Sequence, residues 1–71
     1  MIGERIAMLR KGKGWTQNDL ANATRLSRGY IASIEGGRSP GVKAAYMISR
    51  ALGVEVRELY EGEISVRQIT P

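Results

Sequence analysis

The sequence predicts an all-α fold of five helices within about sixty residues, followed by a short extended tail. Apolar residues recur every three or four positions through most of the chain, which is the spacing of a helix with one buried face. Glycines and helix-capping residues divide this pattern into five segments. From residue 61 to 71 the pattern changes, because Ile64 and Val66 alternate with polar neighbours as in a strand or a linker. We therefore expect one helical domain at 1–60 and a tail at 61–71.

The first two predicted helices are separated by a glycine-rich turn at residues 11–14. One face of the first helix consists of apolar residues at helical spacing, namely Ile2, Ile6 and Leu9. Thr16 is expected to cap the second helix, and Asp19 three residues later completes a near capping box. The expected inner side of the second helix consists of Leu20, Ala21 and Ala23.

The third predicted helix begins after Ser27 as its N-cap and stops at the Gly36-Gly37 pair. Its apolar residues fall together on the side expected to be buried: Leu26, Ile31 and Ile34. The same spacing turns a second set of residues outward: Arg28, Gly29, Ala32 and Ser33.

The last two predicted helices follow Ser39-Pro40 and are separated by Gly53. One face of the fourth helix is expected to consist of Val42, Ala45, Ile48 and Leu52. A final short helix is predicted from Val54, Val56, Leu59 and Tyr60, with Glu55 near its start, where a negative charge suits the helix dipole. The core is expected to contain Trp15, Leu20, Leu26, Ile31, Ile34, Ile48 and Leu52.

Residues 16–38 have the layout of a DNA-binding helix-turn-helix, because two short helices are joined by a tight turn. The charge distribution favours the same interpretation. Between Arg5 and Arg50 nine lysines or arginines accompany two acidic residues, whereas from Ala51 onward two basic residues accompany four acidic ones. A basic body suits a nucleic-acid partner, although charge alone equally fits a solvated surface. The hypothesis of DNA binding depends on the layout and the charge together.

Composition argues against several other classes of protein. The chain has no cysteine, which excludes disulfides, and no histidine, which removes the commonest metal ligand and general base. No apolar run approaches the roughly 20 residues of a membrane helix, and the segment 2–9 is too polar for a signal peptide. We therefore expect a soluble, cytoplasmic protein. No cluster of nucleophile and base and no phosphate loop appears, so we expect neither an enzyme nor a cofactor.

Four linked segments carry a resemblance to a known family: IGERIAMLRKGKG, TQNDLA, SRGYIASIEGGR and ALGV. Over about residues 2–60 the chain resembles the phage-repressor and xenobiotic-response-element type of helix-turn-helix domain. The resemblance implies a compact five-helix, all-α, repressor-like bundle that binds double-stranded DNA as a dimer, without a cofactor. Arg25 departs from the family, which usually has glycine there, and a positive φ would strain it by about 1 kcal/mol. Gly29 departs as well, and its missing side chain lets the third helix approach DNA closely.

Three residues of the third helix are expected to read bases, and the resemblance implies this role for Arg28. Arg28, in the first turn of the third helix, can fork onto O6 and N7 of guanine, or else contact a phosphate or solvent. Ser33 can hydrogen-bond a base edge and Ala32 can meet a thymine methyl, unless the two residues simply fit the groove.

A second group of residues is expected to contact the DNA backbone. Gln17 at the start of the second helix should reach a phosphate, helped by the free N–H groups there. Tyr30 is either a phosphate donor or a partly packed ring. Arg38 and Lys43 lie where similar repressors hold the DNA backbone or enter the minor groove, with solvated charge as the alternative. The family also pairs an arginine with a glutamate, which here implies an ion pair of Arg10 with Glu35.

The predicted function is that of a sequence-specific DNA-binding regulator, a repressor that binds a palindromic operator as a homodimer. The alternative is the antitoxin of a toxin-antitoxin pair, which represses its own operon and binds a toxin through its tail. The tail at 61–71 is accordingly a dimerisation strand, a linker or a site for another protein. Dimerisation is expected from apolar residues of the carboxyl-terminal quarter: Val56, Leu59, Tyr60, Ile64, Val66 and Ile69.

Overall fold

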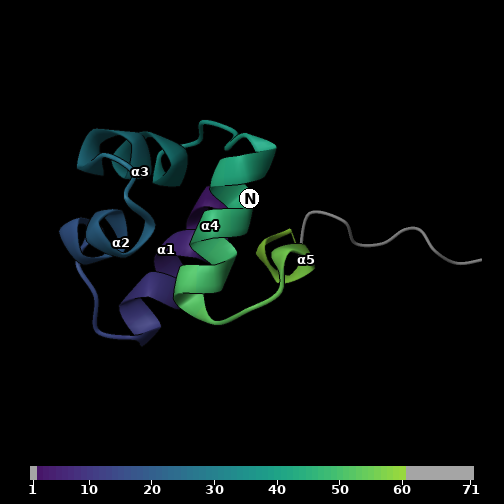
Figure 1. Cartoon of the computed structure of the whole chain (residues 1–71), viewed down its shortest axis with the longest axis horizontal. Helices are drawn as coiled ribbons and strands as arrows, with labels where there is room; N and C mark the ends of the chain where they lie inside the picture. Colours follow the sequence, from purple (N-terminus) through teal and green to yellow (C-terminus); the bar gives the residue numbers. More distant parts are fainter. Residues whose placement is uncertain (1, 61–71) are drawn as a thin grey trace, which may run out of the picture.

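The computed structural model describes residues 2–60 of the 71-residue chain, so the predicted tail and its apolar residues lie outside the described residues. The described part is entirely helical, which confirms the predicted fold class (Figure 1). Its helices are α1 (Ile2–Gly12), α2 (Gln17–Thr24), α3 (Arg28–Glu35), α4 (Val42–Leu52) and α5 (Val56–Leu59). Within residues 2–60, none of these helices has the length and apolar character needed to span a membrane.

Local sequence signals start and stop the helices where they were predicted to. The Thr16 side chain accepts a hydrogen bond from Asp19 N at 3.0 Å, and the Asp19 carboxylate accepts one from Thr16 N at 2.8 Å. This reciprocal capping box begins α2. Ser27 caps α3 in a similar way, since its hydroxyl accepts from Tyr30 N at 3.0 Å. Between these two helices Arg25 adopts φ 64°, the left-handed conformation that the resemblance implied for this turn.

The helices enclose one apolar core. In Figure 1, α2 and α3 lie on one side of α4, α5 lies on the other, and α1 passes behind. α1 packs against α3 and α5, while α4 packs against α2 and α5. Arg5 also connects α1 to α5, because its Nε donates to Glu58 O at 3.1 Å. The buried apolar cluster contains Ile2, Ile6, Leu20, Ala21, Ile31, Ile34, Ala45, Ile48, Leu52 and Leu59.

Predictions for three residues are wrong, and helix geometry explains two of them. Ala23 is exposed, because it lies about 200° around α2 from Ala21, while Thr24 takes the buried position. Val42 is 91% exposed, because it is the first residue of α4 and lies at the edge of the buried face. Leu59 is fully buried in the core of its own molecule, so it is not available to a dimer interface. Two expected core residues, Trp15 and Leu26, are half-buried and pack against the cluster from outside.

Candidate DNA interface

The predicted base-reading residues belong to α3, which lies at one edge of the molecule (Figure 1). Arg28 and Gly29 are exposed, whereas Ala32 and Ser33 are half-buried. A Cβ atom placed on Gly29 would meet no atom within 4 Å, so nothing in the described residues covers the helix at that point. The first turn of α3 is therefore open to a ligand that approaches from outside.

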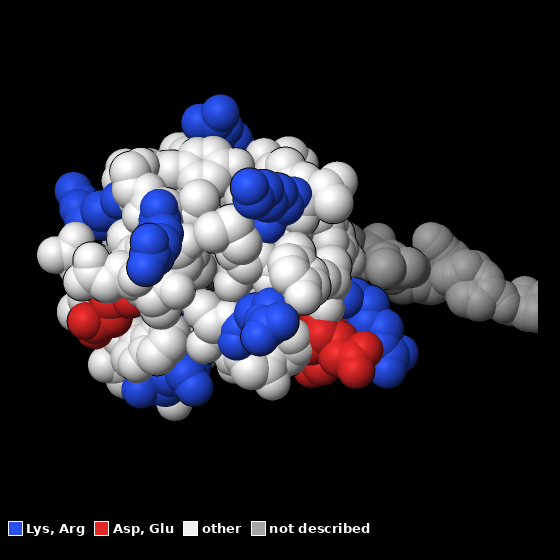
Figure 2. Space-filling view, in the orientation of Figure 1, with Lys and Arg blue, Asp and Glu red and all other residues white. Residues whose placement is uncertain are grey.

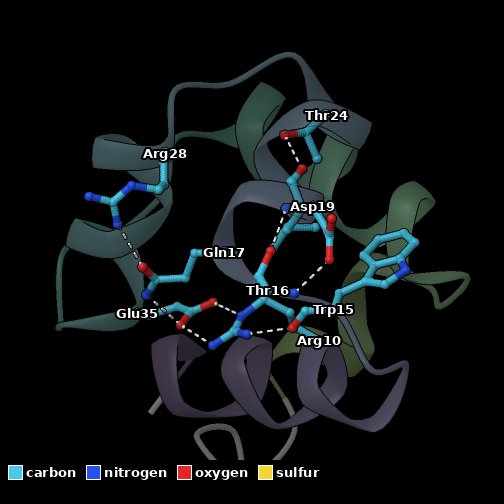
Figure 3. Close-up of polar contacts among 9 residues, drawn as sticks. Arg10, Trp15, Thr16, Gln17, Asp19, Thr24, Arg28 and Glu35 are labelled. Atoms are coloured by element: carbon cyan, nitrogen blue, oxygen red, sulfur yellow. Dashed lines mark hydrogen bonds and ion pairs between the residues drawn. The ribbon is translucent and has the colours of Figure 1, made fainter.

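Behind α3, a buried ion pair joins it to α1 (Figure 3). Arg10 Nε and Nη2 donate to the two carboxylate oxygens of Glu35 at 2.7 and 3.0 Å, and Nη1 donates to Trp15 O at 2.7 Å. The side chains of Arg10 and Glu35 are each 8% exposed. The ion pair that the resemblance implied is thus present, in the bidentate form that fixes the orientation of both groups.

The pKa values of both groups are shifted in the direction that favours their charged states. Hydrogen bonding to Glu35 raises the pKa of Arg10 and outweighs the opposing effect of burial. Burial by itself would raise the pKa of Glu35. Hydrogen bonds from Arg10 and Gln17, together with nearby positive charge, instead keep the Glu35 pKa below the usual range of a glutamate.

Gln17 connects this pair to the exposed arginine of α3. Its side-chain amide donates to Glu35 Oε1 at 3.1 Å, and its carbonyl oxygen accepts from Arg28 Nη1 at 3.2 Å. Figure 3 shows Gln17 between these two residues. The Arg28 side chain is exposed. Gln17 was expected to contact a phosphate, and this bridge was not predicted. No spacing rule reveals it, because Gln17 belongs to α2 whereas Glu35 and Arg28 lie at opposite ends of α3.

Tyr30 connects α3 to the loop that follows it. Its ring is half-buried, its hydroxyl oxygen accepts from Gly41 N at 3.4 Å, and the Arg38 guanidinium lies 4.9 Å from the ring centroid. This distance is that of a cation–π contact, which orients the exposed Arg38 side chain over α3. Lys43 is exposed in the first turn of α4. The structure therefore brings Arg38 and Tyr30 together, while Lys43 lies one loop away.

The face of the molecule seen in Figure 2 carries more basic than acidic side chains. Lysine and arginine side chains are spread across it, and acidic side chains appear only toward its margins. An uneven distribution of this kind creates a positive potential over the surface and attracts polyanions.

Two further residues shape this region without any clear sequence signal. Thr24 Oγ1 donates to Leu20 O at 2.8 Å and accepts from Leu26 N at 3.3 Å, which closes the turn between α2 and α3. Gly3 in α1 lies directly against the carboxyl end of α3. A threonine inside a helix and a glycine near a terminus are both common, so neither stands out before the fold is known.

A family model described as helix-turn-helix matches residues 6–59. The chain belongs to this family. The match covers the helices α2 and α3 and most of the remaining fold, and it confirms the resemblance found in the sequence.

Known proteins agree with this assignment. The HTH-type transcriptional regulator SlrR of Bacillus subtilis is 38% identical over 89% of this chain, and the immunity repressor of Bacillus phage phi105 is 34% identical over 94%. The chain spans 43% and 47% of the lengths of these two relatives. The crystal structure of the biofilm master regulator SinR in complex with DNA superposes with a TM-score of 0.82 at 33% identity. That match covers 86% of this chain and all of the SinR chain.

Proposed function

We propose that this protein is a sequence-specific DNA-binding transcriptional regulator that represses its target by occupying a palindromic operator. The named relatives include a transcriptional regulator and a phage repressor, and the superposed SinR domain was solved on DNA. The observation that carries the proposal is the open first turn of α3, where Arg28 extends from the protein beside the bare backbone of Gly29.

Base recognition follows from the hydrogen-bonding capacity left on α3. Arg28 gives one of its five N–H groups to Gln17, and the others remain for guanine O6 and N7. The Ser33 hydroxyl donates to Tyr30 O at 2.8 Å, so its oxygen acts toward DNA as an acceptor, which suits the amino groups of adenine or cytosine. Ala32 offers a methyl group to thymine.

Backbone contacts follow from donors around the same surface. The N–H groups of Gln17 and Asn18 open α2 and have no partner within the helix, so they suit a phosphate. The second N–H of the Gln17 amide is also available. Tyr30 accepts through its oxygen and keeps its own hydroxyl hydrogen to donate. Arg38 in the loop after α3 and Lys43 in the first turn of α4 supply positive charge.

The experiment begins with selection of binding sites from random duplex oligonucleotides, which identifies the operator. Arg28→Ala should then weaken binding to that operator by about 1 to 3 kcal/mol and relax the preference at one base pair of each half-site. Lys43→Ala is the matched control, because loss of a phosphate contact weakens all sequences alike and lowers the salt dependence. If Arg28→Ala weakened every sequence equally, Arg28 would be a backbone contact. If the wild-type chain selected no sequence, the proposed function would be wrong.

We propose further that the protein binds its operator as a symmetric homodimer, because one recognition helix reads too few base pairs to find a single site in a genome. Among the expected interface residues, Val56 and Tyr60 are half-buried and retain exposed apolar surface. The alternation of Ile64, Val66 and Ile69 supports a contribution from residues 61–71.

Sedimentation tests the dimer. Removal of residues 61–71 should weaken self-association and operator affinity together, while circular dichroism of the helical domain at 1–60 stays unchanged. A full-length chain that stays monomeric at high concentration, or a shortened chain with unchanged association, would contradict this role. No observation on the described residues favours the antitoxin alternative, and we do not propose it.

A further inference from the structure

The backbones of α1 and α3 touch at Gly3. A Cβ atom placed on Gly3 would overlap the carbonyl oxygen of Ile34 and would lie 3.0 Å from the carbonyl oxygen of Glu35. Both obstacles are backbone atoms, which cannot turn aside as the end of a side chain can. Any residue other than glycine at this position must therefore push the two helices apart.

This requirement distinguishes Gly3 from other glycines within the helices. Gly3 has no positive φ, so its role does not come from an unusual backbone conformation. Cβ atoms placed on Gly12 in the same helix, or on Gly29 in α3, would meet nothing within 4 Å. Only the close approach to α3 explains why a side chain is excluded at Gly3.

We propose that Gly3 is a positioning residue for DNA recognition: it allows α1 to set the position of the recognition helix. This inference rests on the proposed function. Glu35 belongs to both contacts, because its carbonyl oxygen faces Gly3 while its carboxylate is bound by Arg10. Gly3 and Arg10 lie seven residues apart, which is about two turns or 10 Å along α1. α1 therefore fixes the end of α3 at two separate points.

A shift at Gly3 reaches the base-reading side chain through hydrogen bonds already described. Movement of Glu35 changes its distance to Gln17, and Gln17 in turn holds Arg28. Bidentate recognition of a base requires the guanidinium at a defined position and angle, so a displacement of this kind affects specific binding more than general attraction to phosphates.

The contact lies at the ends of both helices, because Gly3 is the second residue of α1 and Ile34 and Glu35 are the last two residues of α3. Two helix ends can separate while the rest of each helix stays packed. A cavity of about 120 Å³ lies beside the contact, lined by Ile2, Gly3, Glu4, Glu35, Gly36 and Gly37. Separation of the two helix ends widens this space, and the glycine pair that follows α3 can adjust its backbone to the change. We therefore expect Gly3→Ala to fold, with α3 displaced relative to α1.

The test compares Gly3→Ala with Gly12→Ala, which adds the same methyl group to the same helix where it meets nothing. Binding to the selected operator and to an unrelated duplex is measured at low temperature, after circular dichroism has shown that both variants are folded. Gly3→Ala should lose about ten-fold in operator affinity, within the range of a disturbed bidentate base contact, and keep its affinity for unrelated DNA. Gly12→Ala should match the wild type in both.

A spectroscopic measurement separates repositioning from general damage. The N–H resonance of Arg10 Nε reports its hydrogen bond to Glu35, and it should shift in Gly3→Ala and stay unchanged in Gly12→Ala. If Gly3→Ala does not fold, Glu35→Gln serves instead, because it weakens the attachment of α3 to α1 without adding an atom. The ratio of its affinity for the operator to its affinity for the unrelated duplex should fall.

The outcomes distinguish the two proposals. If the wild-type chain selects an operator and Gly3→Ala binds it equally well, or loses affinity for all DNA alike, the role of Gly3 is wrong and the proposed function stands. The role of Gly3 is also wrong if Glu35→Gln is used in its place and keeps the wild-type ratio of operator affinity to affinity for unrelated DNA. If the wild-type chain selects no operator, both proposals are wrong.

Discussion

Replacing Arg10 by methionine should lower the stability of the free protein by about 3 kcal/mol. The substitution keeps most of the length of the side chain but removes its hydrogen bonds to Glu35, at 2.7 and 3.0 Å, and to Trp15 O, at 2.7 Å. The buried Glu35 carboxylate keeps only the amide of Gln17, at 3.1 Å. Loss of one partner from a buried ion pair ordinarily costs 3–5 kcal/mol, and the bond to Gln17 places this case at the lower end.

The melting temperature of Arg10→Met should accordingly fall by roughly 12–24 °C, since 1 kcal/mol corresponds to about 4–8 °C in a domain of this size. A double variant, Arg10→Met with Glu35→Met, removes both charges. It should be more stable than Arg10→Met alone, because the cost of the single change comes mainly from the carboxylate left without a cation.

The loss should also depend on pH. In the wild type the pKa of Glu35 is lowered, so the stability it contributes is present above the pKa of an unfolded glutamate, about 4.3, and disappears as the pH falls through the lowered value. Without Arg10, burial raises the pKa of Glu35, and protonation then relieves the destabilisation. The difference in stability between wild type and Arg10→Met should therefore be large at pH 7 and narrow in acid.

Thermal melts followed by circular dichroism between pH 3 and 8 measure the loss of stability in Arg10→Met, its recovery in the double variant and the dependence of the loss on pH. An unchanged melting temperature at neutral pH would refute the reasoning, because it would mean that the pair is hydrated in solution. A deficit that stayed constant with pH would show that Arg10 acts through packing and not through the charge of Glu35.

Three further results are expected. Arg25→Gly should raise stability by up to about 1 kcal/mol in thermal melts, because it relieves the left-handed backbone at φ 64°, whereas Arg25→Ala should bring no gain. Tyr30→Phe removes the acceptor for Gly41 N and a phosphate donor, so it should weaken operator and unrelated duplex alike in anisotropy titrations; a loss confined to the operator would contradict this. Operator affinity should fall steeply with salt, with a slope of about 0.9 per neutralised phosphate, and a flat dependence would argue against backbone contacts.

Local signals predicted the helix boundaries well because the groups that satisfy a helix end lie within a few residues of it. Thr16 and Asp19 form the predicted capping box, and Ser27 caps α3 as expected. The left-handed backbone at Arg25 and the ion pair of Arg10 with Glu35 were predicted from the family resemblance, and both are present. Neither follows from local rules, since the first breaks a conformational preference and the second joins residues 25 positions apart.

Predictions of burial failed at the margins of the apolar faces. Val42 and Ala23 are apolar and near the expected spacing, yet both are exposed, because a helix face has edges and ends that hydrophobicity alone does not locate. Leu59 was expected to contribute to a dimer interface, because the other helices were expected to form a complete core without it. The structure shows that α5 completes the core.

By itself, the sequence determined the helical class, the order and caps of the helices and the outward placement of Arg28 and Gly29, because each depends on contacts within one or two turns of the chain. Only the tertiary structure decided how Arg28 is supported and where α3 lies. The bridge from Glu35 through Gln17 to Arg28, and the contact of Gly3 with the end of α3, join segments that are distant along the chain. Such contacts arise when close packing brings two helices together. They produce no periodic pattern in the sequence, because the residues in contact are far apart along the chain.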